Sequence, residues 1–308
     1  MERANSVTVI INPQANHGRA REVVPVIKRA FPDARVFVTE EAGDAEKLAG
    51  AIEKSAGVVA VGGDGTVSEI VNGLAAAGKL DVPLGVIPCG SGNDFCKTAG
   101  LPLAFDAAVK TVLAGLESGL TRQLDLGCVN GRYYANSLAI GFDARVTHVA
   151  NAIKYETQKS GLTLYLTALF RVVFHDFYCH TIRLRLDGAD WEERNVLLVA
   201  VNNGYVYGGG FKITPEADPA DGLLDVCVID AIPRRQVLWR LPFAITGRHK
   251  HMRPAHFSKV RRAEIESKTE LPAALDGELI HDISFKIEVK PGALKLIKGK
   301  AASGHRRV

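Results

Sequence analysis

The sequence lacks the segments that would place the chain in or across a membrane. Its 308 residues hold no uninterrupted apolar run of about 18 residues, the length that a membrane-spanning helix needs. The first residues also lack the charged stretch followed by an apolar one that marks a secretory signal. Cysteine is scarce, since only five are present, scattered and without a CxxC pair. That usage is typical of a reducing compartment and argues against a structural zinc site, so we expect a cytoplasmic protein.

Several common enzyme motifs are absent too. The chain has no GxxxxGK(S/T) phosphate loop, no GxGxxG followed by a ribose-binding acid, and no GxSxG nucleophile elbow. Aromatic residues make up 7% of the chain and no nucleic-acid-binding motif occurs, so we expect no nucleic acid partner. With 47% hydrophobic residues the chain can bury a large core, and its length predicts two domains.

Acidic residues are missing from residues 231–263, although that stretch carries nine lysines and arginines. Two interpretations stay open: an ordinary solvated face, or a surface that rests against anionic lipid headgroups. Residues 162–178 form an amphipathic helical segment, with apolar side chains at spacings of three and four. That apolar face either packs on a sheet or faces lipid.

Strand and helix patterns alternate over residues 1–124. Short β-branched runs predict buried strands at residues 7–12, 36–39, 58–61 and 83–88, and helical spacing lies between them at residues 19–30, 44–54 and 67–77. The alternation is typical of a doubly wound parallel sheet, in which ligands bind at the carboxyl ends of the strands. Residues 125–289 change to alternating strands and turns with one helical segment, and predict a β-sandwich domain.

The stretch "VAVGGDGTVSEIVNG" at residues 59–73 places Asp64 among three glycines, between a buried strand and a helix. Glycines leave no Cβ between the backbone and an approaching group, and the N–H groups at a helix start attract anions. A tight turn with Asp64 as a helix cap is the simpler interpretation, but three glycines around one acid favour a phosphate-binding loop.

Three further segments end neighbouring strands of the same predicted sheet. They are "NPQANHGRA" at residues 12–20, "PCGSGNDF" at residues 88–95, and Thr39. Each alone is a common turn composition. Together they line one edge of a sheet with small residues, hydroxyls and amides, as expected of a nucleotide phosphate site.

These motifs, with "DPADGLLD" and "LDGE", resemble the diacylglycerol kinase catalytic-domain family, and in particular the bacterial soluble lipid kinases related to sphingosine and ceramide kinases. GGDGT is shared with NAD kinases, whereas its PxGxxNDF partner singles out the lipid kinases. The resemblance extends over residues 7–297. It implies an NAD kinase-like and phosphofructokinase-like nucleotide domain that binds ATP and is completed by residues 290–308, followed by a lipid- and magnesium-binding β-sandwich.

The resemblance also assigns residues. It implies that ATP is contacted by Asn12, Pro13, Gln14, Ala15, Asn16, Thr39, Gly63, Asp64, Gly65, Thr66, Val67, Ser68, Glu69 and Ser91. It implies that Mg²⁺ is bound by the backbone carbonyls of Asp218 and Leu223 and by the Asp221 carboxylate, and that Glu278 is the general base. From the residues alone, a turn acid is the preferred interpretation of both Asp221 and Glu278, and only the family resemblance favours a functional role.

Two positions depart from the family pattern. Asn16 stands where the family usually has glycine, so the backbone of the first loop is expected to differ, with Gly18 as a substitute. Ser91 replaces the usual threonine and keeps the hydroxyl.

Asp64 is placed to hold the Mg²⁺ that accompanies ATP, and Asp94 extends that acidic network. The expected function is therefore an ATP- and Mg²⁺-dependent kinase that phosphorylates the hydroxyl of a diacylglycerol-like lipid, working at a membrane surface as a peripheral protein. The alternatives are an NAD kinase-like enzyme with a soluble substrate, and an inactive regulator that binds a nucleotide or a lipid. The sequence leaves open which lipid is used and whether the chain forms a homodimer.

Overall fold

The structure is a computed structural model that describes residues 7–157 and 159–299. Its helices are α1 (Val24–Ala30), α2 (Asp44–Gly50), α3 (Asp64–Ala76), α4 (Asp94–Thr98), α5 (Phe105–Ser118), α6 (Phe142–Thr157), α7 (Gly161–His175) and α8 (Arg234–Thr246), with 3-10 turns at Arg19–Val23 and Arg248–His251. Its strands are β1 (Thr8–Ile11), β2 (Arg35–Val38), β3 (Val58–Gly62), β4 (Leu84–Pro88), β5 (Thr121–Val129), β6 (Arg132–Tyr134), β7 (Leu138–Gly141), β8 (His180–Leu186), β9 (Glu192–Asn202), β10 (Leu224–Asp230), β11 (Ala255–Val260), β12 (Arg262–Leu275) and β13 (Glu278–Ile297).

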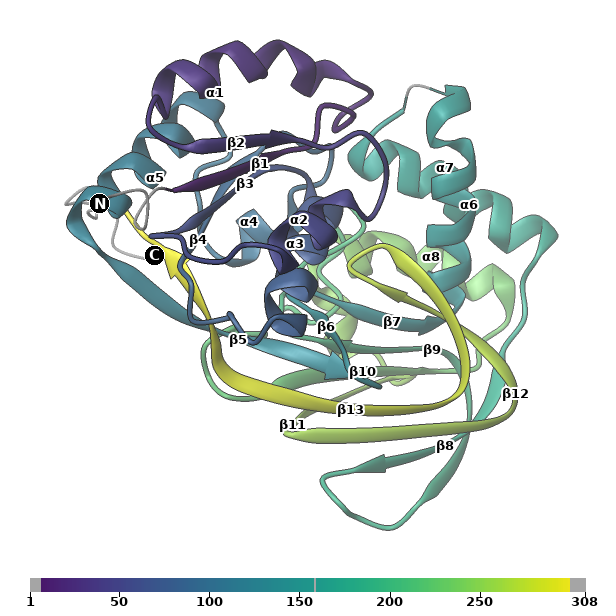
Figure 1. The fold of residues 1–308 in the computed structure, drawn as a ribbon. Coiled ribbons are helices and arrows are strands. Elements are labelled where there is room, and N and C mark those ends of the chain that lie inside the picture. Colours follow the sequence, from purple (N-terminus) through teal and green to yellow (C-terminus); the bar gives the residue numbers. More distant parts are fainter. Residues whose placement is uncertain (1–6, 158, 300–308) are drawn as a thin grey trace.

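The first domain is built on a parallel sheet in the order β2-β1-β3-β4 (Figure 1). Its strands bury alternate side chains in two separate cores, as a strand period of two requires. Ile10 and Ala60 pack with α2, α3 and α4 on one face, whereas Ile11 and Val61 pack with α1 and α5 on the other. The doubly wound parallel sheet predicted from the sequence is confirmed.

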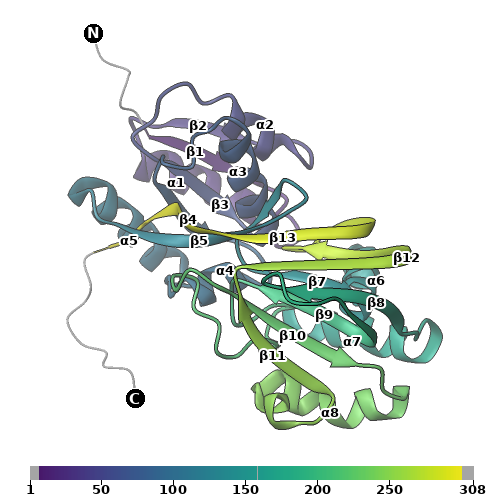
Figure 2. The ribbon, with the colours of Figure 1, turned by 90° about the horizontal axis from the view of Figure 1, so that it is seen from below.

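The second domain is an antiparallel β-sandwich, also as predicted. Strands β5 to β13 enclose a single apolar core in which Tyr134 and Phe285 are the largest fully buried side chains. The glycine at position 127 is required there, because a Cβ on it would lie 2.0 Å from the Tyr134 ring. In Figure 2 the long strands β12 and β13 run across the middle of the molecule, and α8 lies at the opposite end from the first domain.

Three helices cover the sandwich, so the prediction of a single helical segment in this domain was wrong. The predicted segment is α7, while α6 and α8 were missed. Helix α6 follows β7 directly and its sequence is rich in polar residues, and α8 contains Pro242 within a basic stretch. The three helices pack together over β7, β9 and β10 around Leu169, Leu198 and Val237. In the described ranges, no helix has the length and apolar character needed to cross a bilayer.

Strand β13 belongs to both domains. It pairs antiparallel with β12 and β5, and its last residues reach β4 through Leu296 opposite Leu84. Phe285 and Ile287 lie in the sandwich core, and Leu294 lies in the core of the first domain. The strand therefore fixes the two domains relative to each other. Of the segment expected to complete the first domain, residues 300–308 lie outside the described residues.

We expect Leu294→Ala to destabilise both domains together. The side chain is fully buried, so its truncation leaves a cavity and should lower the free energy of unfolding by about 2–5 kcal/mol. Ile283→Ala, on the same strand with 53% of the residue exposed, is the matched control and should change it by less than about 0.5 kcal/mol. Urea titrations followed by circular dichroism measure both. Equal losses in the two variants would contradict the role given to β13.

Candidate active site

Two glycine loops meet at the carboxyl ends of β3 and β4. The backbones of Gly63 and Gly90 touch, since a Cβ added to Gly90 would lie 2.5 Å from the Gly63 Cα. Asn93 closes the second loop on itself, with its side-chain oxygen accepting the Gly90 N–H at 2.9 Å and its amide donating to the Gly90 carbonyl. Only glycine allows this approach, so the two loops form one surface of exposed backbone at the sheet edge.

Asp64 and Asp94 face each other across Gly92. A Cβ placed on Gly92 would lie 3.1 Å from Asp64 Oδ2 and 3.5 Å from Asp94 Oδ2. Asp64 is the first residue of α3, rather than part of the turn before it, and its Oδ1 accepts the Phe95 N–H at 2.9 Å. Each acid thus begins a helix, and the glycine between them leaves their carboxylates open to a common ligand.

The charges of this pair are incompletely compensated. Burial and the neighbouring Asp94 charge raise the pKa of Asp64, and the backbone N–H groups of Phe95 and Asp94 oppose that rise. Asp94 is itself bonded to Lys97 Nζ at 2.8 Å and to the Gly209 N–H at 2.8 Å. A cation bound between Asp64 and Asp94 would relieve the repulsion, and carboxylate oxygens are the ligands that Mg²⁺ prefers.

The loop after β1 is hydrogen-bonded to the start of α3, beside the glycine loops. Asn12 donates from its side-chain amide to Thr66 Oγ1 at 3.1 Å, which joins the end of β1 to the first turn of α3. Asn16, His17 and Gly18 all have positive φ, at 51°, 58° and 84°. Asparagine adopts this left-handed backbone more readily than most residues, so Asn16 can hold this conformation without being a glycine.

The other predicted ATP contacts differ in what they expose. Gly65 has open space at its Cα, and Ser91 lies in the cleft described below. Thr39, Val67 and Ser68 are buried, so their side chains are not exposed to a nucleotide in this structure. Pro13, Gln14 and Ala15 lie in the turn after β1.

Glu69 has a structural contact of its own. Its carboxylate accepts the Ala45 N–H at 3.2 Å and so caps the start of α2.

A cleft separates the glycine loops from the second domain. The first domain contributes Asp64, Ser91, Gly92 and Asp94 to its walls. The sandwich and its helices contribute Asn136, Ser137, Lys154, Tyr165, Asp276 and Gly277, among others. The structure therefore brings the predicted acids of the first domain against the "LDGE" turn of the second, as a two-substrate site requires.

Asp276, the neighbour of the predicted base, is the acid of that turn that lines the cleft. Its carboxylate accepts three backbone N–H groups, from Ala135, Asn136 and Ser137, at 2.7–3.0 Å. Burial raises the pKa of Asp276 to about 7 against the opposing effect of these bonds, and the charge of Asp64 adds to the rise. The only sequence signal that could have singled out Asp276 was its place in the "LDGE" motif.

Glu278 lies at the start of β13 and is half exposed. Its carboxylate is paired with Arg132 at 2.8 Å, and the same guanidinium binds Glu46 of α2 at 2.8 Å. Arg132 thus bridges the two domains beside the cleft, and Glu278 is not among the residues that line it. The assignment of Glu278 as general base stays a prediction.

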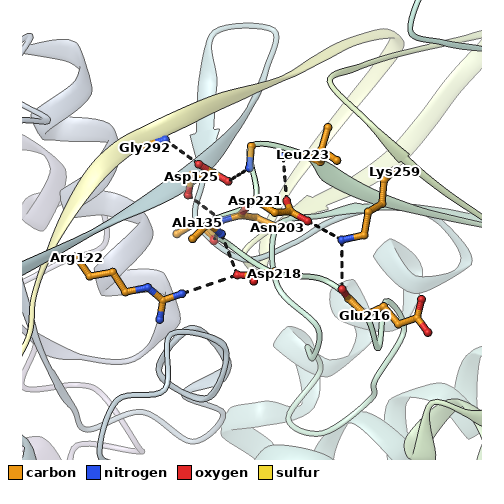
Figure 3. Close-up of polar contacts among 12 residues, drawn as sticks. Arg122, Asp125, Ala135, Asn203, Glu216, Asp218, Asp221, Leu223, Lys259 and Gly292 are labelled. Atoms are coloured by element: carbon orange, nitrogen blue, oxygen red, sulfur yellow. Dashed lines mark hydrogen bonds and ion pairs between the residues drawn. The ribbon is translucent and has the colours of Figure 1, made fainter. Parts of the chain in front are cut away.

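The "DPADGL" loop is held by Asp125 of β5, a residue that the sequence pattern did not single out (Figure 3). Asp125 accepts the N–H groups of Gly222 and Gly292 at 2.7 Å each, and its own N–H donates to the Pro219 carbonyl. The Asp218 carboxylate lies 3.8 Å from Arg122. Nothing in the pattern around Asp125 distinguishes it from an ordinary strand acid.

A pocket with apolar walls lies beneath α8. Its walls come from α6, α7, α8 and the outer face of the sandwich, and include Leu169, Leu198, Phe211, Val237, Leu241 and Ala244. The Asp143 carboxylate, bonded to the Tyr207 hydroxyl, is a polar group in this wall. A space of this kind suits a hydrocarbon chain more than a soluble nucleotide.

Comparison with known proteins matches both halves of the chain. Residues 6–129 match the diacylglycerol kinase catalytic domain, and residues 136–298 match the YegS C-terminal NAD kinase beta sandwich-like domain. A Pseudomonas aeruginosa protein named "Probable lipid kinase YegS-like" is 31% identical over 302 residues, covering 96% of this chain and 95% of its own. A diacylglycerol kinase from Mycobacterium tuberculosis is 30% identical over 304 residues, with 95% and 94% covered.

Solved structures share the fold. A Bacillus anthracis protein described as "a putative diacylglycerol kinase" matches with a TM-score of 0.76 at 27% identity, covering 97% of this chain and 99% of its own. An NAD kinase from Archaeoglobus fulgidus, solved with ATP, matches with a TM-score of 0.57 at 14% identity, covering 96% and 94%, which shows the fold alone. The fold and site define a two-domain protein of the NAD kinase-like architecture. Within that class, the chain belongs to the diacylglycerol kinase catalytic-domain family with a YegS-type C-terminal domain.

The raised pKa of Asp276 predicts a specific pH dependence of stability. The carboxyl titrates near 3.8 when unfolded and near 7 when folded, so the native state holds a proton that the unfolded chain has released between these values. Stability contributed by this group is present below about pH 4 and is lost as pH rises to about 7. Asp276→Asn should remove this contribution. Urea titrations of both proteins across that range measure the difference, and parallel curves would contradict the prediction.

Proposed function

We propose that the protein is an ATP-dependent lipid kinase that transfers the γ-phosphate to the hydroxyl of a diacylglycerol-like lipid, with Mg²⁺ accompanying the nucleotide. The observation that carries the proposal is the Asp64–Asp94 pair beside Gly92, which faces the second domain across the cleft. The family membership and the names of the relatives support the kinase class and the lipid substrate.

The chemistry needs positioning and charge neutralisation more than covalent help. The backbone surface formed by Gly63 and Gly90 and the start of α3 is suited to binding phosphates. Asp64 and Asp94 would hold Mg²⁺, which supplies charge neutralisation at the phosphates when bound. We propose Glu278 as the acceptor of the lipid hydroxyl proton, which requires its ion pair with Arg132 to open. Asp276 then acts as a positioning residue, because its carboxylate is held by three backbone N–H groups.

The apolar pocket beneath α8 favours a lipid over the soluble substrate of an NAD kinase-like enzyme. Its lining is apolar except for a few groups such as Asp143, and α6 and α7 contribute to both this pocket and the cleft. An inactive regulator is disfavoured by the presence of Asp64, Asp94 and Glu278 together.

The test is transfer of labelled γ-phosphate from ATP to a panel of diacylglycerols, other lipid alcohols and NAD. We expect label in a lipid product and none in NADP. Asp64→Asn should cut turnover by at least about 10²-fold, because the metal and phosphate charges lose a counter-ligand. Asp106→Asn is the matched control, since Asp106 is an exposed acid in the first turn of α5. Label in NADP, or retention of more than about a tenth of turnover by Asp64→Asn, would overturn the assignment.

We further propose that the protein docks on anionic bilayers through α7 and α8. Trp239 and Phe243 lie one turn apart on α8 and are 52% and 37% exposed, while Phe170 and Phe174 are exposed on the neighbouring α7. The acid-free stretch adds exposed basic residues at the start of α8 and after its end: Arg234, Arg235, Arg248 and Arg253. Exposed aromatic side chains flanked by arginines suit the interface of an anionic membrane. Docking there would bring the pocket under α8 next to the lipid.

We expect binding to anionic vesicles to weaken as salt shortens the Debye length from about 10 Å at 0.1 M to about 3 Å at 1 M. Trp239→Ala and Phe243→Ala should each reduce the bound fraction at low salt. Phe37→Ala is the control, because Phe37 is similarly exposed on β2 of the other domain. Vesicle co-sedimentation measures all three. Equal binding to neutral and anionic vesicles would remove the basic stretch from this account.

A further inference from the structure

The carboxylate expected to bind Mg²⁺ in the "DPADGL" loop is already bonded within the protein (Figure 3). Asp221 Oδ1 accepts the Leu223 N–H at 3.0 Å, which closes the turn. Asp221 Oδ2 accepts a charged hydrogen bond from Lys259 Nζ at 2.6 Å. A divalent cation bound to this carboxylate would therefore share it with an ammonium group.

Lys259 is held at this point by the sheet. In the antiparallel pairing of β10 with β11, Lys259 stands directly opposite Asp225. Its Nζ lies 3.3 Å from Asp225 Oδ2 and 3.3 Å from the backbone carbonyl oxygen of Glu216, in addition to Asp221. Three N–H donors thus meet three oxygens, from two carboxylates and one carbonyl. Those are the oxygen types that a hard cation takes in proteins.

The electrostatics of the site keep the lysine charged. Lysine carries a positive charge at neutral pH, and here its ammonium lies between the carboxylates of Asp221 and Asp225. A divalent ion placed on Asp221 would be repelled by this ammonium.

Hydrogen bonds to Asp125 also hold the loop in place without a metal. Asp125 accepts the Gly222 N–H at 2.7 Å, and its N–H donates to the Pro219 carbonyl at 2.7 Å.

We propose that the Lys259 ammonium takes the place of a metal ion in this loop, so that the wild-type loop binds no divalent ion. The residue at position 259 then determines whether the loop can bind one. The proposal departs from the Mg²⁺ site that the family resemblance implies at Asp218, Asp221 and Leu223. It concerns the loop of the second domain, and Mg²⁺ bound with ATP between Asp64 and Asp94 is a separate matter. Replacing the lysine by an uncharged side chain should leave an oxygen-lined site that is open to Mg²⁺.

The experiment measures the melting temperature in EDTA and in a titration to millimolar MgCl₂, without ATP. Wild type and Lys259→Arg should show the same small response, which arises from Asp64 and Asp94. Lys259→Met should melt lower in EDTA and regain about 2–4 °C more than wild type as Mg²⁺ is added. The double variant Lys259→Met with Asp221→Asn should lose that extra gain. Counting bound Mn²⁺ by electron paramagnetic resonance should give one more site in Lys259→Met than in wild type.

Lys290→Met is the matched control. Lys290 pairs with Glu288 at 2.6 Å, and its side chain is 36% exposed, as is that of Lys259. It should not gain a Mg²⁺ response. The proposal is overturned if wild type shows a Mg²⁺ stabilisation that Asp221→Asn alone abolishes, or if folded Lys259→Met binds no additional Mn²⁺. If Lys259→Met does not fold, the Mg²⁺ stabilisation of wild type compared with that of Asp221→Asn still tests the proposal. None of these readouts depends on kinase activity, so they stand apart from the lipid assay.

Discussion

The pairing of β13 with strands of both domains is the constraint on which the rest of the structure depends. The strand runs from the "LDGE" turn to the parallel sheet, so the same hydrogen-bonded ladder positions Asp276 at one end and Leu296 beside β4 at the other. Because its side chains contribute to two cores, the domains are joined by packing as well as by backbone bonds. The width of the cleft between the glycine loops and the sandwich follows from this connection.

Across that cleft the molecule concentrates negative charge that its own cations do not fully balance. Lys97 compensates Asp94, and backbone N–H groups hold Asp276, but the pKa values of Asp64 and Asp276 are both raised by burial and by neighbouring carboxylates. A site of this kind is at its most stable with a bound cation, which accords with the use of a metal–nucleotide complex. The second-domain loop is the contrast, since there a lysine supplies the positive charge.

The features that could be predicted from the sequence are those encoded locally. The parallel sheet and the glycine loop around Asp64 follow from short apolar runs and adjacent glycines, and the structure has both. Features that rest on distant contacts could not be predicted: Asp125 stands in an ordinary strand, and its role comes from Gly222 and Gly292, far along the chain. The bond between Lys259 and Asp221 depends on the β10–β11 register in the same way. Helix α8 was not predicted, because Pro242 and the basic residues obscure the apolar spacing of a helix.

The central claim is that nucleotide phosphates bind where Gly63, Gly90 and the Asp64–Asp94 pair converge. The most direct measurement is a crystal structure with a non-hydrolysable ATP analogue and Mn²⁺, using anomalous scattering to locate the metal. The account predicts a metal ion between Asp64 and Asp94, with the terminal phosphate facing the cleft wall formed by Asp276. A nucleotide bound elsewhere, or a metal that contacts neither acid, would contradict it.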